Sequence, residues 1–441
     1  MPNSLRSRIR SASWAAAIFA VVFLVDAACP VVSSFDSRWT IPVALSLLDH
    51  GDTNLDEYAA TIDPADGAVE RVNGHYYNWY PVAVPVLAAP IVWSLRQTAP
   101  LLRATFPSGG PIRAAFLNGG FLASRTLVEM LTASVFVALT AVVIFFIGRC
   151  FLPDRYSAFL SLVFAFATSA WSTASRGLWQ HGPSMLMLSI ALYFLLLADR
   201  APWLSILAAI PTALSYTLRP SNALFVAAAT MYIATRHRRY LIPYLFAAFP
   251  IAAAFFIYNE SLYGRLLPTY FTLRPSATVN VIGTAEALAG ALVSPSRGLF
   301  VYTPIFLIAI WGMVHALRSR WQAPLAIYLI AVIVGNWLLL GLYFHFWWGG
   351  HSYGPRQLSD MTPLFIFFLI PPLTKWRESA KPRGPAIAFL ALLAVSVFIH
   401  SRGARSADAY IWNVSPQNVD QNTSRLWDWR DPQFLRGLHW R

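Results

Sequence analysis

The sequence predicts an all-α polytopic membrane protein with about eleven transmembrane helices. Of its 441 residues, 57% are hydrophobic and only 12% are charged, whereas a soluble domain carries about a quarter charged residues. Apolar runs of about 16 to 22 residues recur along nearly the whole chain, a length that crosses a bilayer as a helix. The net charge of +13 does not indicate a nucleic-acid partner, because the basic residues lie at the ends of these runs, where membrane topology requires them.

The first apolar run, residues 14–32, is long enough to span the membrane. Arg6, Arg8 and Arg10 precede it, so we expect the N-terminus to lie in the cytoplasm and the chain after residue 32 to lie outside. The run lacks a clear small-residue cleavage site, and we therefore expect no cleavable signal peptide.

Residues 33–126 are expected to form one large outer (periplasmic) loop that carries interfacial helices. Apolar residues recur at helical spacing from Ile41 to Leu48, which is typical of a helix lying on a membrane surface. Residues 79–95 are apolar enough to cross the membrane, but prolines interrupt them, so we expect re-entrant or interfacial backbone there. A crossing at this point would move every later basic cluster to the outside.

The remaining spans are expected within residues 127–400, and the basic clusters between them then all fall on the cytoplasmic side. The tail, residues 401–441, contains four tryptophans and is expected to form an interfacial cap rather than a substrate lid. Cys29 and Cys150 lie near opposite ends of different spans, so we expect no disulfide. The expected spans after the first are 127–148, 156–173, 183–198, 202–217, 221–235, 240–258, 298–317, 323–344, 360–374 and 385–400.

The strongest candidate for chemistry is Asp36, which directly follows the first span. An acid at the mouth of a span costs free energy unless it has a function, although an Asp at this position could also cap the following helix. Arg38 follows two residues later and could pair with Asp36, reach the lipid headgroups or bind phosphate. We favour catalysis for Asp36.

Arginines on the outer side have no topological reason to be there, which favours a function for them. Arg219 and Arg356 show this most clearly, and Arg176 and Arg297 share the reasoning more weakly. The planar guanidinium grips phosphate in two places. Polar residues gather in four patches on the same expected face as Asp36, and Arg176, Arg219 and Arg356 each lie in one of them: 73–81, 176–183, 218–222 and 347–356.

This inventory favours transfer of a sugar from a lipid phosphate. The sequence has no GxxxxGK[ST] motif and no GxGxxG motif after a strand, so an activated group on the outer side would arrive on a lipid. One carboxylate could accept the proton of the acceptor, and cations could hold the departing phosphate. His and Asp residues are present, but no ligand spacing requires a metal, and we leave open a divalent metal as cofactor.

The sequence also resembles the GT-C glycosyltransferases, most closely the branch of the protein O-mannosyltransferases and the lipid A aminoarabinose transferase. The resemblance rests on short motifs: Asp36-x-Arg38-Trp39 with Gly51-Asp52, Asn73-Gly-His-Tyr-Tyr, Arg176…His181-Gly-Pro183, Tyr263-Gly-x-x-x-Pro268, Ser294-Pro-x-Arg297-Gly-Leu-Phe300 and Trp347-Trp-Gly-Gly…Tyr353-Gly-Pro-Arg356. It implies a polyprenyl-phosphate sugar donor, an outer acceptor and a catalytic acid at Asp36. A second acid often follows the first in this family, and this chain has Ser37 there.

We therefore expect an integral membrane glycosyltransferase with Asp36 as general base, acting with inversion at the sugar carbon. The partners are a polyprenyl-phosphate-linked sugar, membrane lipid and a glycan, lipid or protein acceptor. The Arg-rich, Lys-poor composition suits a bacterial inner membrane. The expected substrate-binding residues are Arg38, Asp52, His75, Tyr76, Arg176, His181, Arg219, Arg297, Trp348, His351, Tyr353 and Arg356.

Two alternatives stay open from the sequence. An oligosaccharide polymerase or ligase would use a polyprenyl-diphosphate donor in a similar layout and would need more cations. A lipid-linked sugar transporter or flippase would place polar groups at mid-membrane and often shows paired repeats. The polar residues of this chain gather at the outer ends of the spans, and the sequence shows no internal repeat.

Overall fold

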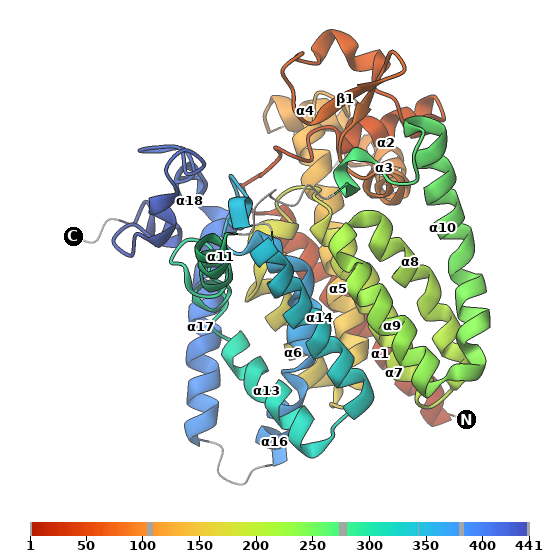
Figure 1. The fold of residues 1–441 in the computed structure, drawn as a ribbon, viewed down its shortest axis with the longest axis vertical. Coiled ribbons are helices and arrows are strands. Elements are labelled where there is room, and N and C mark those ends of the chain that lie inside the picture. The colour runs from red at the N-terminus through yellow and green to blue at the C-terminus, as the bar shows by residue number, and fades with distance from the viewer. Residues whose placement is uncertain (1, 104–108, 273–279, 343, 379–382, 439–441) are drawn as a thin grey trace.

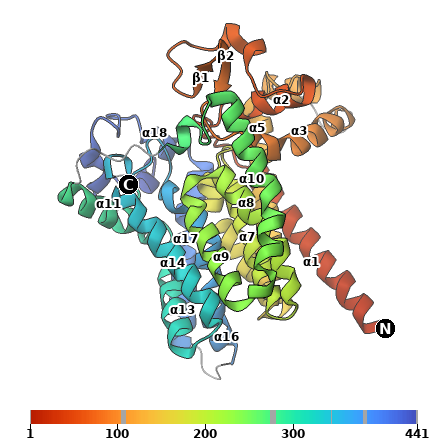
Figure 2. The ribbon, with the colours of Figure 1, turned by 45° about the vertical axis from the view of Figure 1, so that its right-hand side comes forward.

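The chain folds into a helical bundle capped at one end by a layer of short helices and a hairpin (Figures 1 and 2). The computed structural model describes residues 2–103, 109–272, 280–342, 344–378 and 383–438. Among these residues, six helices are long and apolar enough to cross a membrane, which makes this a polytopic helical membrane protein. The six are contained in α1 (Pro2–Ala27), α5 (Arg125–Arg149), α7 (His181–Ala198), the segment Arg238–Tyr263 with α10 (Leu241–Tyr263), α14 (Ala323–Leu342) and α17 (Arg383–Arg405).

The other expected spans also contain helices, but these helices are shorter. The expected span at 360–374 is divided between η8 (Arg356–Met361), α15 (Thr362–Phe367) and α16 (Ile370–Glu378). Prolines cause the division, because they are tolerated in the first turn of a helix and not in its interior. The remaining short helices of the bundle are α6 (Asp154–Phe166), η3 (Pro202–Ala208) with α8 (Ala209–Leu218), α9 (Ala223–Arg236), α12 (Leu299–Tyr302) and α13 (Phe306–Ser319).

The cap is built from α2 (Thr40–Asp49), the strands β1 (Val69–Val72) and β2 (His75–Asn78), α3 (Ala83–Leu102) and α4 (Pro111–Leu117). In Figure 1, α3 is seen nearly end-on whereas α10 is seen from the side, so α3 runs across the bundle. The two strands pair antiparallel, which adds a small sheet to the expected all-α fold. Asn73 and Gly74 at the turn have φ values of 52° and 93°, which a two-residue hairpin turn requires.

The apolar stripe of α2 contacts protein. We expected this stripe to lie on the membrane, but Ile41 and Ala44 are fully buried in a cluster with Val84 and Ala88 of α3. The same cluster includes Val128 of α5. Helix α2 therefore anchors the cap to the bundle, and this anchoring fixes the position of the segment just before it, which contains Asp36.

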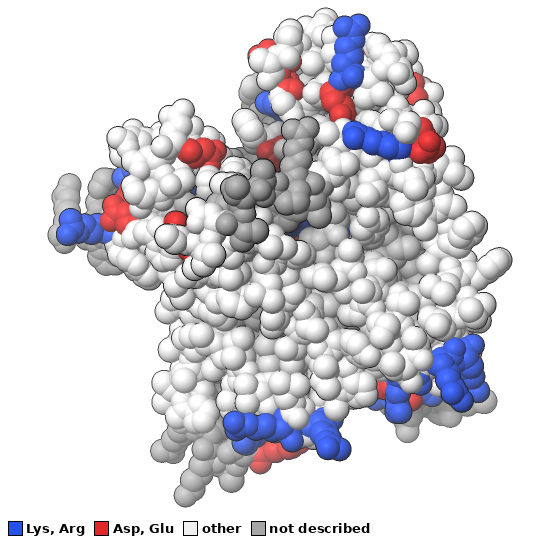
Figure 3. Space-filling view, in the orientation of Figure 1, with Lys and Arg blue, Asp and Glu red and all other residues white. Residues whose placement is uncertain are grey.

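Basic residues gather at the end of the bundle opposite the hairpin (Figure 3). This is the end where α9 turns into α10 and where α13 ends beside α16 (Figure 1). The N-terminus of α1 also lies toward this end. The charge distribution therefore gives the bundle two chemically different ends.

The C-terminal tail lies beside α11 (Val281–Val293) at the same end as the hairpin (Figures 1 and 2). After α17 it forms α18 (Ala407–Ile411), η9 (Thr423–Trp427) and η10 (Gln433–Leu435). Trp412 and Leu426 of the tail pack with Trp347 and Trp348 in one buried cluster. The tail is thus a packed part of the fold.

Candidate active site

Asp36 lies in a pocket at the hairpin end of the bundle. Four segments that are distant in the sequence line this pocket, namely residues 36–40, 80–84, 178–180 and Arg356. The first follows α1, the second lies between β2 and the start of α3, the third precedes α7, and Arg356 begins η8. The fold therefore brings three of the sequence patches to one place.

Arg356 is the closest charged partner of Asp36. Its Nη2 donates a hydrogen bond to Asp36 Oδ2, and both side chains remain partly accessible, at 15% and 22% exposure. The guanidinium carbon of Arg356 lies 3.5 Å from the centroid of the Trp179 ring, and Trp179 Nε1 donates to Ser33 O at 2.7 Å. This stacking fixes the plane of the guanidinium beside the carboxylate.

A second guanidinium, that of Arg219, is joined to the first through His181. Arg219 Nη1 lies 2.8 Å from His181 Nδ1, and Arg356 Nε lies 3.4 Å from His181 Nε2. A neutral imidazole has only one nitrogen with a free lone pair, so His181 cannot accept hydrogen bonds from both arginines at once. In addition, Arg219 Nε has no hydrogen-bond partner among the described residues. A bound anion would accept hydrogen bonds from the N–H groups of Arg219 and Arg356 that the protein leaves without an acceptor.

Asp360 neutralises Arg219 and was missed by the sequence analysis. It is 2% exposed, pairs with Arg219 Nη1 and lies 3.3 Å from His181 Nδ1. Two carboxylates and two guanidinium groups therefore balance each other at the site. Asp360 lies at the start of an expected span, and a carboxylate there is itself a signal for function.

Glu129 is a second acid that the sequence analysis missed. This fully buried residue of α5 accepts hydrogen bonds from the Ser37 hydroxyl and from the backbone N–H of Leu178 at 2.9 Å. Its Oε2 has no partner among the described residues. Glu129 thus ties the residue next to Asp36 to the segment that carries Trp179, and its place inside an apolar run was the available signal.

Tyr80 forms the wall of the pocket on the hairpin side. Burial and the nearby Asp36 raise the pKa of Tyr80 well above its ordinary value, although Arg356 opposes the shift. The Tyr80 hydroxyl therefore keeps its proton at neutral pH and can act as a hydrogen-bond donor. Its ring packs against Trp79 and Tyr270, with centroids 5.3 and 5.5 Å away.

Arg38 does not face Asp36. It pairs with Asp66, and its guanidinium lies over Phe35 at 5.1 Å from the ring centroid. Burial raises the pKa of the Asp66 carboxyl, but hydrogen bonds from Trp39, from the backbone N–H of Ala68 and from Arg38 bring it below its ordinary value overall. Arg38 is therefore part of the packing of the cap.

Three other expected substrate-binding residues also lie outside the Asp36 pocket. His75 Nδ1 bonds Asp56 Oδ2 at 2.5 Å, Tyr76 packs against a cluster that includes Trp39, and Asp52 is exposed on the surface. His75 and Tyr76 belong to β2, and neither they nor Asp52 line the Asp36 pocket.

Arg176 holds the end of α1. It is fully buried and donates to Asp26 O at 2.6 Å and Cys29 O at 3.3 Å. Its Nη2 also lies 3.8 Å from the Asp26 carboxylate. These carbonyl groups lie at and just after the end of α1, where a helix leaves carbonyl groups without helical partners, so Arg176 holds the end of the first helix and the start of the segment that leads to Asp36.

Arg297 holds the C-terminal tail. It is 1% exposed and donates to Asn413 Oδ1 at 2.7 Å, Gln433 Oε1 at 2.8 Å and Trp348 O at 3.0 Å. Burial lowers the pKa of Arg297 to about 10, so it remains charged at neutral pH. Its donors are occupied by protein acceptors, which differs from the phosphate contact that we expected.

Trp348, His351 and Tyr353 fasten the same region. Trp348 Nε1 donates to Asp420 Oδ1 at 2.7 Å, and His351 Nε2 lies 2.9 Å from Asn418 Oδ1. Tyr353 donates to Ile399 O at 2.6 Å. The loop of Arg356 is therefore held by the tail and by α17, and the structure does not bring these three residues into the Asp36 pocket.

The described residues contain no group of three or more His, Cys, Asp and Glu side chains arranged to hold a metal ion. At Asp36 the neighbouring charge is a guanidinium.

The fold and the pocket together define a polytopic helical membrane protein with an acid–arginine site at one end of its bundle. No family model and no curated protein sequence matches the chain. Among solved structures, the chain is similar to the crystal structure of ArnT from Cupriavidus metallidurans bound to undecaprenyl phosphate. The two share 13% sequence identity with a TM-score of 0.47, over 90% of this chain and 68% of that chain. A likeness this distant leaves the function to be inferred from the chain's own residues.

Proposed function

We propose that the chain is a membrane glycosyltransferase of the GT-C type, which transfers a sugar from a polyprenyl-phosphate donor to an acceptor hydroxyl with inversion. One observation carries this proposal: Asp36 is paired with Arg356 in an accessible pocket, and Arg219 and Arg356 both lie within hydrogen-bond distance of His181. This is one partly exposed carboxylate together with two guanidinium groups, a group type that binds phosphate.

The donor phosphate would bind between Arg356 and Arg219. Both guanidinium groups face the same imidazole, which can accept from only one of them, and Arg219 has an N–H without a protein acceptor among the described residues. Charge-assisted hydrogen bonds to phosphate are about twice as strong as neutral ones. The phosphate would thus use donors that the protein leaves incompletely satisfied.

Donor binding would also release the base. In the structure, the Asp36 carboxylate is occupied by Arg356. When the phosphate attracts Arg356, Asp36 becomes free to accept a proton. The acceptor oxygen then forms a bond to the anomeric carbon, the bond from this carbon to the phosphate oxygen breaks, and the acceptor proton passes to Asp36. The bonding electrons leave with polyprenyl phosphate, whose added charge the two arginines stabilise.

Ser37 and Glu129 act as positioning residues in this scheme. The hydrogen bond between them holds the segment of Asp36 against α5, while Leu178 connects Glu129 to the segment of Trp179. Base and phosphate site are therefore fixed to the same helix, and such fixed geometry is what accelerates a transfer reaction.

Charge supports the side of the membrane that we propose. The basic end of the bundle lies opposite the hairpin end (Figure 3), which contains the pocket, and basic loops stay in the cytoplasm. This charge distribution supports a pocket on the outer face, where a lipid-linked donor and not a nucleotide sugar would be at hand, and the Arg-rich, Lys-poor composition suits a bacterial inner membrane.

The proposal is tested by incubating purified protein with a panel of polyprenyl-phosphate sugars and polyprenyl-diphosphate sugars, together with hydroxyl acceptors, and identifying products by mass. We expect transfer from a monophosphate donor and inverted configuration by NMR. Arg38→Lys is the control for arginine variants in the pocket. It should keep wild-type activity, because Arg38 does not line the pocket and pairs with Asp66. Transfer only from diphosphate donors, or no transfer at all, would overturn the proposal.

A further inference from the structure

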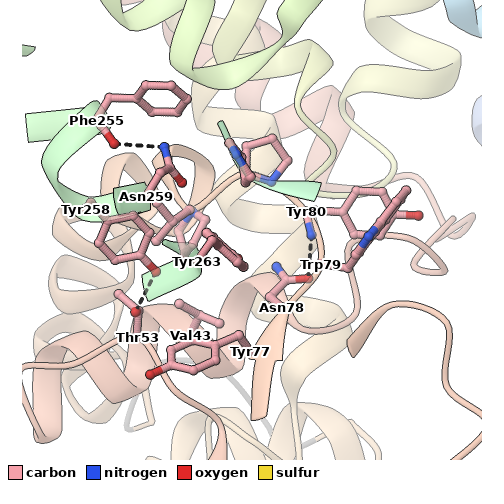
Figure 4. Close-up of a pocket in the computed structure, with 14 residues that line it drawn as sticks. Val43, Thr53, Tyr77, Asn78, Trp79, Tyr80, Phe255, Tyr258, Asn259 and Tyr263 are labelled. Carbon is pink, nitrogen blue, oxygen red and sulfur yellow. Dashed lines mark hydrogen bonds between the residues drawn. The ribbon is translucent and has the colours of Figure 1, made fainter. Parts of the chain in front are cut away.

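A second pocket adjoins the Asp36 pocket and shares a wall with it. It lies between the hairpin region, residues 77–82, and the C-terminal part of α10, residues 255–263 (Figure 4). Tyr80 and Pro81 line both pockets. The two pockets therefore meet at these two residues.

We propose that this second pocket binds the acceptor, and that the acceptor is a neutral saccharide. This inference rests on the proposed function, because it names the molecule that would receive the sugar. None of the residues that line the second pocket is charged, in contrast to the Asp36 pocket. The charged lining of the Asp36 pocket would thus favour the phosphate-bearing donor, and the uncharged lining of the second pocket would favour the uncharged acceptor.

The walls of the second pocket suit a sugar ring. They include the rings of Tyr77, Trp79, Tyr258 and Tyr263 (Figure 4). Aromatic faces bury the apolar face of a ligand, and their hydroxyl groups form hydrogen bonds at its edge. Glu70, just outside the lining, interacts electrostatically with Tyr258 and Tyr263 and would disfavour an anionic ligand.

Asn78 supplies the hydrogen-bonding group that points to a ligand. It is 8% exposed, and its Oδ1 accepts from the backbone N–H of Tyr80 at 3.3 Å. Its Nδ2 has no partner among the described residues. A buried donor without an acceptor costs about 1–3 kcal/mol, and a sugar hydroxyl oxygen in the pocket would remove this cost.

Thr53 and Tyr258 provide a second polar position in the same pocket. Their hydroxyl oxygens lie 2.8 Å apart, and either can be the donor. This pair can therefore accept from or donate to a ligand hydroxyl, which is the versatility that a polyhydroxylated ligand requires.

The test measures binding without donor and without turnover. Full-length protein in nanodiscs is titrated with the methyl glycosides of glucose, galactose and mannose, with methyl glucuronide, and with a short serine-containing peptide, by saturation-transfer NMR. We expect saturation transfer to at least one neutral glycoside and none to the glucuronide or the peptide.

The decisive variant is Asn78→Asp, which keeps the oxygen that holds Tyr80 and replaces the unpartnered N–H donors with an acceptor. We expect about tenfold weaker glycoside binding from the loss of one buried hydrogen bond, with the helix content of the wild type by circular dichroism. Trp79→Leu should weaken binding as well. The matched controls are the exposed positions Asn118→Asp and Trp429→Leu, which should bind like the wild type.

Equal binding by Asn78→Asp and the wild type, binding of the glucuronide or peptide in place of neutral glycosides, or no saturation transfer at all would overturn the inference. The transfer assay is independent of these binding measurements, so the glycosyltransferase proposal can hold even if the inference about the acceptor pocket fails. Conversely, glycoside binding that depends on Asn78, in a protein that transfers nothing, would show that the proposed function alone has failed.

Discussion

At the scale of single residues, Arg356 makes four different contacts. It pairs with Asp36, stacks on Trp179, reaches His181 and donates to Gly349 O at 3.3 Å. Only a planar cation with several donors can make these contacts together. The pocket therefore requires arginine here, and not merely a positive charge.

Replacing Arg356 with lysine should raise the KM for a polyprenyl-phosphate donor and lower kcat/KM by about 10- to 100-fold, the loss of about 1.5–3 kcal/mol from one charged hydrogen-bond set. Lysine keeps the charge but has neither the fork nor the flat face. The measurement is steady-state transfer with varied donor. An unchanged KM in Arg356→Lys would show that Arg356 does not hold the phosphate.

At the scale of elements, α1 and the tail are each held by one buried arginine. Arg176 binds the end of α1, and Arg297 binds the tail and the loop before Arg356. The two arginines therefore position the chain segments that carry Asp36 and Arg356, without lining the Asp36 pocket themselves.

Arg176→Met should destabilise the protein by about 3–5 kcal/mol, because it leaves the Asp26 carboxylate buried without a cation. Unfolding in a denaturing detergent measures this loss. The double variant Arg176→Met with Asp26→Leu should recover the part of the stability that the uncompensated carboxylate costs, but not the part due to the lost hydrogen bonds to the carbonyl groups of Asp26 and Cys29. A double variant as unstable as Arg176→Met would mean that the ion pair is not the cause.

Arg297→Gln should loosen the tail without unfolding the bundle. The substitution removes the bonds to Asn413 and Gln433, so limited proteolysis should cut within residues 412–435 faster than in the wild type. Arg430→Gln, at an exposed position of the same tail, is the control and should be cut at the wild-type rate. Equal cleavage of both variants would exclude a tethering role for Arg297.

At the scale of the whole molecule, the charge distribution predicts orientation. In intact cells, a membrane-impermeant maleimide should label Arg71→Cys on the hairpin and leave Arg238→Cys between α9 and α10 unlabelled. Both variants are made in a Cys150→Ser background, since the native Cys29 is buried. Labelling of Arg238→Cys alone would mean that the protein has the opposite orientation, and it would contradict a site on the outer face.

Much of the site follows from the sequence, because residues at the same ends of different spans meet in the bundle. Asp36, His181, Arg219 and Arg356 are brought together in this way. The partner of each charge could not be predicted, since it depends on long-range packing. Arg38 pairs with Asp66, and Arg176 donates hydrogen bonds to carbonyl groups at the end of α1.

The acids at positions 129 and 360 were overlooked for a related reason. Each lies inside or at the edge of an apolar run. The apolar composition of such a run identifies a span, and a single carboxylate within it does not change that assignment. The breaks between the helices of residues 360–374 were not predicted either, because the length of an apolar run does not show how prolines divide it. The number of long helices is therefore less predictable than their location.

The central claim is that Asp36 accepts the acceptor's proton while the arginines hold the lipid phosphate. The most direct measurement compares wild type and Asp36→Asn for single-turnover transfer from a polyprenyl-phosphate sugar and for binding of that donor. We expect the variant to bind the donor at least as well, because Arg356 is released, and to transfer about 10²–10⁴-fold more slowly. Wild-type transfer by Asp36→Asn would contradict the account.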